Sequence, residues 1–177
     1  MNIAFIGYGH VGAPLADRLQ RLGHTVTLAA ADPESKSLKA LRARNPALRT
    51  ASPREAVRGA EVVFLATPYQ ANAAALQAVS GEWKGQVLVD CTNPVGPNLS
   101  HGLNNVRSGS EEVQQHAPGA RIVKAFTIYG YENFEDSSFP SYREVKPAML
   151  FCGQDADAKK IVGGLIASLA RIIHEGA

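Results

Sequence analysis

The stretch that decides the fold is Ile3-Ala4-Phe5-Ile6-Gly7-Tyr8-Gly9-His10-Val11-Gly12, near the start of the chain. Its first four residues are apolar and predict a buried strand, and a Gly-x-Gly-x-x-Gly pattern follows at once. A helical spacing of apolar residues comes next, at Val11, Leu15, Leu19 and Leu22. A strand, a glycine loop and an amphipathic helix in this order predict a dinucleotide-binding βαβ unit.

The three glycines have separate roles in this pattern. Gly7 permits the tight turn, Gly9 lets a pyrophosphate approach the backbone, and Gly12 lets the helix pack closely on the strand. The phosphates would then meet the free N–H groups and the positive dipole end of the helix. The residues predicted to bind the pyrophosphate of a nicotinamide dinucleotide are Gly7, Tyr8, Gly9, His10, Val11 and Gly12.

Strand and helix patterns alternate along the rest of the chain. Strands are predicted at 3–6, 25–28, 48–50, 61–66, 86–90, 121–126, 148–152 and 172–174. Helices are predicted from Asp32-Pro33, after the capping box Ser52-Pro53-Arg54-Glu55, over 69–79 and over 155–170, with a long loop at 129–146. The predicted fold class is α/β: a Rossmann-like, doubly wound, mainly parallel sheet in a single domain spanning 1–177.

Composition narrows the range of functions. The chain has 177 residues, of which 45% are hydrophobic and 19% charged, with a net charge of +2. Basic residues are interspersed with acidic ones, so no nucleic-acid or membrane partner is expected. No secretory signal or membrane-spanning run is evident, which favours a cytoplasmic protein. Cys91 and Cys152 lack metal-ligand spacing, and we expect each to be a buried, inert thiol and the chain to have no metal site.

The sequence leaves the choice between NAD and NADP open. Asp32 lies about 20 positions after the glycine pattern, where an acidic residue would accept hydrogen bonds from the adenosine ribose of NAD. It could equally cap the next helix. Ser35, Lys36 and Lys39 lie within plausible reach of the 2′-phosphate of NADP.

Polar residues follow three strands whose carboxyl ends should meet in one crevice. The segments are Ala66-Thr67-Pro68-Tyr69, Asp90-Cys91-Thr92-Asn93-Pro94 and Lys124-Ala125-Phe126-Thr127. Ligands of doubly wound sheets bind beyond the carboxyl ends of the strands, so we expect the side chains of Thr67, Thr92 and Asn93 to orient the nicotinamide ribose. Ordinary turn formation is the alternative, because Thr-Pro and Asn-Pro are common at turns.

Four motifs together resemble the deazaflavin-dependent NADP oxidoreductase family: residues 6–12, Ala66-Thr67-Pro68, Thr92-Asn93-Pro94 and Val123-Lys124-Ala125-Phe126. The cytosolic domain of the six-transmembrane metalloreductases belongs to the same group. The resemblance implies NADP(H) as cofactor, a deazaflavin or flavin as co-substrate, and hydride transfer between them, with Phe126 and Thr127 near the acceptor. The chain departs from the family at Ala30-Ala31, where a Ser-Arg pair is usual, and at Thr127, where Asn is usual.

No catalytic side chain is predicted, because hydride transfer between stacked rings needs alignment and no protein nucleophile. A small-molecule redox acceptor and a homodimer are expected. Two alternatives stay open: a non-catalytic dinucleotide-sensing module, and a small carbonyl or imine reductase that works as a dimer.

Overall fold

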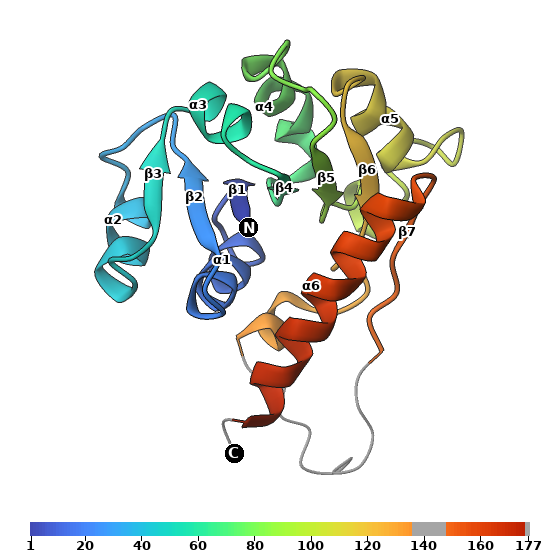
Figure 1. Ribbon diagram of the computed structural model, residues 1–177. Coiled ribbons are helices and arrows are strands. Elements are labelled where there is room, and N and C mark those ends of the chain that lie inside the picture. The colour runs from blue at the N-terminus through green and yellow to red at the C-terminus, as the bar shows by residue number, and fades with distance from the viewer. Residues whose placement is uncertain (136–147, 176–177) are drawn as a thin grey trace.

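A seven-stranded sheet organises the molecule, with the strand order β3-β2-β1-β4-β5-β6-β7 (Figure 1). The computed structural model describes residues 1–135 and 148–175. The strands are β1 (Asn2–Ile6), β2 (Thr25–Ala29), β3 (Arg49–Ala51), β4 (Val62–Leu65), β5 (Val87–Asp90), β6 (Arg121–Lys124) and β7 (Cys152–Gly153). Pairing is parallel from β3 to β6, and β7 pairs with β6 antiparallel. The predicted fold class is confirmed.

The described residues form six α-helices and three short 3₁₀ turns, of which all but the last helix lie between strands. The helices are α1 (Gly12–Arg21), α2 (Lys36–Arg44), α3 (Pro53–Arg58), α4 (Asn72–Ala78), α5 (Gly109–His116) and α6 (Ala156–Glu175). The 3₁₀ turns are η1 (Tyr69–Ala71), η2 (Pro97–Leu99) and η3 (Tyr131–Phe134). In the described ranges 1–135 and 148–175, no helix has the length and apolar character that crossing a membrane requires.

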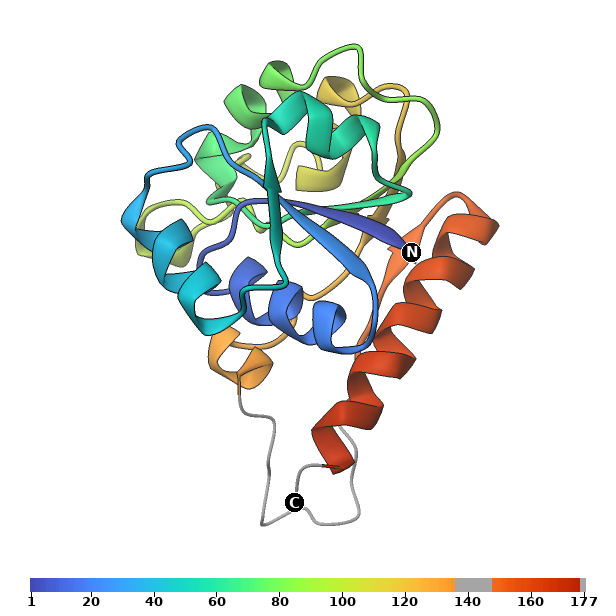
Figure 2. The ribbon, with the colours of Figure 1, turned by 60° about the vertical axis from the view of Figure 1, so that its left-hand side comes forward.

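The helices cover both faces of the sheet, because each central strand is apolar on both sides. In β1, Ile3 and Phe5 join the core beneath α1, α2 and α6, whereas Ala4 and Ile6 join the core beneath α3, α4 and α5. Figure 2 shows α3, α4 and α5 on one side of the sheet and α1 and α6 on the other. Continuous burial on both faces explains why the parallel strands are near-continuous apolar runs.

Two predicted elements begin or end elsewhere. The helix predicted from Asp32-Pro33 starts at Lys36, since the Asp32 carboxylate accepts a hydrogen bond from the Glu34 N–H and forms a local turn. The strand predicted at 172–174 is wrong, because α6 continues to Glu175. No glycine or proline lies between 165 and 175, so the helix continues through this segment. The prediction failed because a short apolar run such as Ile172-Ile173 fits a buried helix as well as a strand.

Other boundaries also shift. The strand predicted at 148–152 is reduced to Cys152–Gly153, and the helix predicted over 69–79 is η1 followed by α4. The sequence did not predict α5, and η3 lies inside the loop predicted at 129–146, of which 136–146 are outside the described residues. The Ser52 capping box forms as predicted, with Glu55 reaching back to the Ser52 N–H.

Candidate functional site

The glycine loop joins β1 to α1 in a conformation that two of its glycines require. Gly7 has φ +94°, and a β-carbon there would lie 2.6 Å from the carbonyl carbon and oxygen of Ala66. A β-carbon on Gly12 would lie 2.2 Å from the Gly7 carbonyl oxygen. Gly7 and Gly12 are therefore needed by the turn and by the close approach of α1 to the sheet.

Gly9 differs from these two, since a β-carbon there would meet no atom within 4 Å. Its backbone also lies outside the left-handed region. The helix α1 that follows has Val11 at its N-cap, no side-chain cap and no acidic residue in its first turn. The open space over Gly9 thus adjoins the N-terminus of α1, where no N-cap side chain accepts a hydrogen bond from the first N–H groups of the helix. Such an arrangement is suited to binding an anion.

A pocket of about 590 Å³ lies over this loop, at the carboxyl ends of β1, β2 and β4. Seven of its lining residues are predicted site residues: Gly7, Tyr8, Gly9, Asp32, Ala66, Thr67 and Pro68. The sequence reasoning missed the others: Ile6, Ala29, Ala31, Ser37, Pro53, Ala74, Ala75 and Ala78. The volume is within the range of small-molecule and cofactor sites. The alanines of α4 provide an apolar wall, and the Ala-rich run 71–75 was the available sequence signal.

The end of the pocket near β2 carries mixed chemistry. Asp32 lines it, and so does Ser37 in the first turn of α2. The Ser35 hydroxyl is buried without a hydrogen-bond partner in the part of the chain that the structure describes. Neither Ser35 nor Lys36 is among the lining residues, and Lys39 pairs with Glu34 at 2.6 Å. Ser37 was missed because the helix was predicted to start at Asp32, which places Ser37 beyond the first turn.

The remaining residues of the glycine loop lie outside the pocket lining. Val11 packs against the apolar core. His10 is exposed, and its ring stacks on Tyr131 of η3 with a centroid distance of 4.5 Å. His10 therefore joins the glycine loop to the segment that follows β6.

The loops after β5 and β6 converge, since the Asn93 side-chain amide donates a hydrogen bond to the Thr127 carbonyl at 3.1 Å. Phe126 has φ +60° and a buried ring, which lies 5.8 Å from Phe64 and 6.0 Å from Phe134. Neither Phe126 nor Thr127 is among the residues that line the pocket over the glycine loop.

An ion pair between a buried carboxylate and a partly exposed ammonium group lies behind these loops. Asp90, at the end of β5, is fully buried, and its carboxylate is 3.1 Å from the Lys124 ammonium at the end of β6. Ser110 of α5 donates a hydrogen bond to the same carboxylate oxygen at 2.7 Å, and Lys124 also donates to the Thr92 carbonyl. The Lys124 side chain is 21% exposed, and its ammonium group is held against Asp90.

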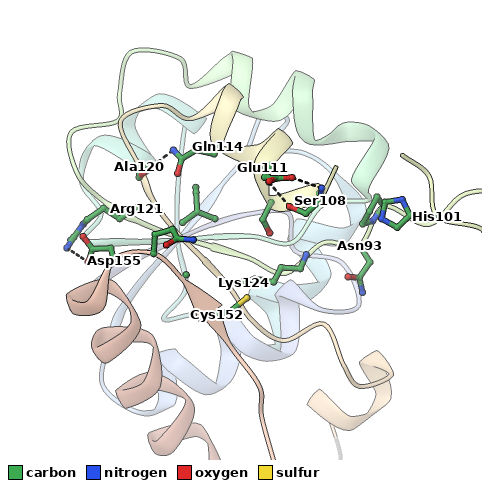
Figure 3. A pocket seen from close by; sticks show the side chains of 16 residues that line it. Asn93, His101, Ser108, Glu111, Gln114, Ala120, Arg121, Lys124, Cys152 and Asp155 are labelled. Carbon is green, nitrogen blue, oxygen red and sulfur yellow. Dashed lines mark hydrogen bonds and ion pairs between the residues drawn. The ribbon is translucent and has the colours of Figure 1, made fainter. Parts of the chain in front are cut away.

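A second hollow, of about 710 Å³, runs along β6 beneath α5. Figure 3 shows Asn93 and His101 at one end, Arg121 and Asp155 at the other, and Lys124 between them. Asn93 and Pro94 thus line this hollow and not the pocket over the glycine loop. Cys152 is exposed in it, contrary to expectation, whereas Cys91 is buried and burial raises the pKa of its thiol.

Metal ligation has no support in the described residues, where no group of three or more His, Cys, Asp or Glu side chains is placed to hold an ion. The polar side chains that line the pocket over the glycine loop include the Thr67 and Ser37 hydroxyls and the Asp32 carboxylate, which can orient a ligand by hydrogen bonds.

Comparison with known proteins agrees with this geometry. A family model described as NADP oxidoreductase coenzyme F420-dependent matches residues 2–94. The F420-dependent NADP reductase of Methanocaldococcus jannaschii is 26% identical over 114 residues, which are 62% of this chain and 49% of that protein. The matched segment thus spans about half the length of this curated relative.

Two solved structures share nearly the whole fold. A protein of Arthrobacter sp. FB24, described as a candidate F420-dependent NADP-reductase, aligns with a TM-score of 0.82 and 29% identity over 96% of this chain and 80% of that one. The hypothetical protein SMa0349 of Sinorhizobium meliloti aligns with a TM-score of 0.76 and 26% identity over 96% of this chain and 82% of that one.

The sheet order and the glycine loop define a Rossmann-type domain of the dinucleotide-binding class. The family model covers more than half of the sequence and confirms the resemblance carried by its motifs. The chain belongs to the family of coenzyme F420-dependent NADP oxidoreductases.

Proposed function

We propose that the protein transfers hydride between NADP(H) and a deazaflavin- or flavin-type acceptor. The observation that carries the proposal is the open Gly9 position beside the N-terminus of α1, inside a pocket of about 590 Å³. An uncapped helix end and a cradle that any side chain would fill are what a pyrophosphate needs. Membership of the family supports the choice of reaction.

The chain's own residues would bind and align the reactants. The N–H groups at the start of α1 would hold phosphate, and Thr67 lines the same pocket. Asn93 lines the neighbouring hollow along β6, where its side chain is bonded to the Thr127 carbonyl. The bound nicotinamide supplies or takes up the hydride, so the protein needs to provide alignment and exclusion of water.

We propose NADP as the preferred dinucleotide. The Ser37 hydroxyl, which lines the pocket in the first turn of α2, is a suitable donor for a 2′-phosphate. Asp32 opposes this preference, because its carboxylate lines the same pocket and repels a phosphate. Discrimination between NADPH and NADH should therefore be modest in the wild type.

Calorimetric titration with NADPH and with NADH tests the cofactor. We expect tighter binding of NADPH, and Asp32→Asn should increase the preference about fivefold or more by removing one repulsive charge of about 1 kcal/mol. Ser37→Ala, the matched pocket variant that changes no charge, should decrease it. Tighter binding of NADH in the wild type would contradict the assignment.

The reaction is tested by following NADPH absorbance after addition of an oxidised deazaflavin or, separately, FMN or FAD. Oxidation of NADPH only when such an acceptor is present supports the proposal. Turnover of small carbonyl or imine substrates without any flavin would favour the reductase alternative. Binding without oxidation by any acceptor would favour a dinucleotide sensor.

We also propose a homodimer. Leu150 and Phe151, which precede the short edge strand β7, are 68% and 39% exposed. Exposed large apolar side chains beside a sheet edge are typical of contacts with another chain. Light scattering at several protein concentrations should give twice the chain mass, and the chain mass at all concentrations would exclude the dimer.

A further inference from the structure

A chain of buried polar side chains connects the β5–β6 ion pair to the pocket over the glycine loop. Asp90, Thr92 and Asn72 are 0%, 3% and 5% exposed. Thr92 Oγ1 lies 2.7 Å from Asp90 Oδ1, Asn72 Nδ2 lies 2.8 Å from Thr92 Oγ1, and Thr67 Oγ1 lies 2.7 Å from Asn72 Oδ1. Thr67, the last member, lines the pocket.

The donor and the acceptor of each hydrogen bond between Asp90, Thr92, Asn72 and Thr67 follow from the negative charge of Asp90. The Asp90 carboxylate is paired with the Lys124 ammonium and can only accept, so the Thr92 hydroxyl must donate to it. With its single proton used, Thr92 can only accept from Asn72, which turns the amide nitrogen of Asn72 toward it. A flipped amide would place two acceptors against each other in a buried site.

The same logic extends to Thr67. The Asn72 carbonyl oxygen faces the Thr67 hydroxyl and can only accept, so Thr67 donates its proton inward. Only lone pairs of Thr67 Oγ1 are then left for a ligand in the pocket. A free threonine hydroxyl can turn to donate or accept, whereas this one is fixed.

We propose that Asn72, Thr92 and Asp90 are positioning residues that make the Thr67 hydroxyl an acceptor for a ribose hydroxyl of the bound dinucleotide. The inference rests on the proposed function, because it needs a dinucleotide in this pocket. Phosphate oxygens are excluded as partners of Thr67 Oγ1, since they also only accept. A ribose is the donor-bearing group next to a phosphate, and the Thr67 backbone lies beside Gly7, where a β-carbon would be 2.8 Å from the Thr67 nitrogen.

The test is a cycle of protein variants against ligands that lack one hydroxyl. NADPH and its deoxy analogues, each lacking one hydroxyl of either ribose, are titrated into the wild type, Thr67→Val, Thr92→Val and Thr92→Ser. One analogue should bind the wild type about threefold to tenfold more weakly than NADPH, the range of one lost hydrogen bond. Thr67→Val should bind that analogue and NADPH equally.

Thr92→Val tests the positioning role. It removes the anchor that orients Asn72, so discrimination between NADPH and the same analogue should fall below about twofold, and Thr92→Ser should restore it. Should Thr92→Val fail to fold, Asn72→Leu serves in its place, because leucine is similar in size and can neither donate to Thr92 nor accept from Thr67, which frees the Thr67 proton. Melting temperatures of all variants identify losses that come from stability alone.

The outcomes separate this inference from the proposed function. Wild-type discrimination that disappears in Thr67→Val and Thr92→Val supports it. Equal binding of NADPH and every deoxy analogue by the wild type, or weakening of all ligands in parallel by Thr92→Val, overturns the inference and leaves dinucleotide binding intact. No binding of NADPH by the folded wild type overturns both.

Discussion

Replacement of Gly9 by Asp should abolish tight dinucleotide binding while leaving the fold intact. A β-carbon at this position meets no atom within 4 Å, and the backbone conformation is open to any residue. The new carboxylate therefore enters the space proposed for the pyrophosphate without disturbing the protein. Stability should change by no more than about 0.5 kcal/mol, as is usual for an exposed substitution.

The loss of affinity has an electrostatic and a steric part. A carboxylate about 5 Å from one phosphate charge costs about 1 kcal/mol at the dielectric constant of water and about 3 kcal/mol at an effective value near 20. These limits correspond to roughly fivefold and 150-fold weaker binding. Gly9→Asn has the same size without the charge and isolates the steric part.

Calorimetric titration with NADPH at two salt concentrations checks both parts. The difference between the Asp and Asn variants should shrink as ionic strength rises, because the screening length is about 10 Å at 0.1 M salt and about 3 Å at 1 M. Thermal unfolding provides the control for folding. Wild-type affinity in a folded Gly9→Asp protein would refute the placement of the pyrophosphate over this loop.

Three further substitutions test packing and titration. Gly12→Ala should lower the free energy of unfolding by about 1–3 kcal/mol or more, measured by urea denaturation, because its β-carbon would lie 2.2 Å from the Gly7 oxygen. The hydrogen bond and the charge of Arg58 lower the pKa of Glu82 in the folded protein. The ionised Glu82 therefore stabilises the fold above the ordinary pKa of 4.5, and this contribution is lost as the pH falls through the lower pKa of the folded state. In Glu82→Gln, the free energy of unfolding measured by urea denaturation should depend less on pH between 6 and 3. An unchanged pH dependence would contradict the ion pair. Burial, followed by the charge of the terminal amino group, lowers the pKa of His24, so the folded state prefers its neutral form and stability declines as pH falls below the ordinary 6.5. His24→Gln should weaken that decline between pH 7 and 5 in the same assay, and a wild-type decline in the variant would exclude His24 as its cause.

The β1–glycine loop–α1 unit could be predicted because its determinants are local. Apolar periodicity and glycine spacing both point to the same turn, and the structure shows that Gly7 and Gly12 have no room for a side chain. The capping box at Ser52 was found for the same reason. An equivalent box at Ser108 begins α5, yet that helix was missed because Val113 is the one apolar side chain it buries, which leaves no periodic stripe to detect.

The residues that line the end of the pocket near β2 could not be predicted as closely as the glycine loop. Whether Asp32 or a serine faces the ribose depends on where α2 begins, and that depends on a turn made by Asp32 itself. The turn delays the helix to Lys36 and brings Ser37 into the lining. An error of a few residues at a helix start, ordinary for sequence patterns, therefore changes which side chains meet the ligand.

The polar chain behind Thr67 lies furthest from what sequence can show, because strand register determines it. Parallel pairing places Leu65, Asp90 and Lys124 side by side as Cα partners at the ends of β4, β5 and β6. A slip of one residue between β5 and β6 would separate Lys124 from a fully buried carboxylate, and an unpaired buried charge costs about 3–5 kcal/mol. The ion pair thus opposes such a slip and fixes the positions of the loops that follow both strands. Asp90 also sets the direction of the hydrogen bonds that end at Thr67. A single buried charge therefore governs both where these loops lie and from which ligand groups the Thr67 hydroxyl can accept a hydrogen bond.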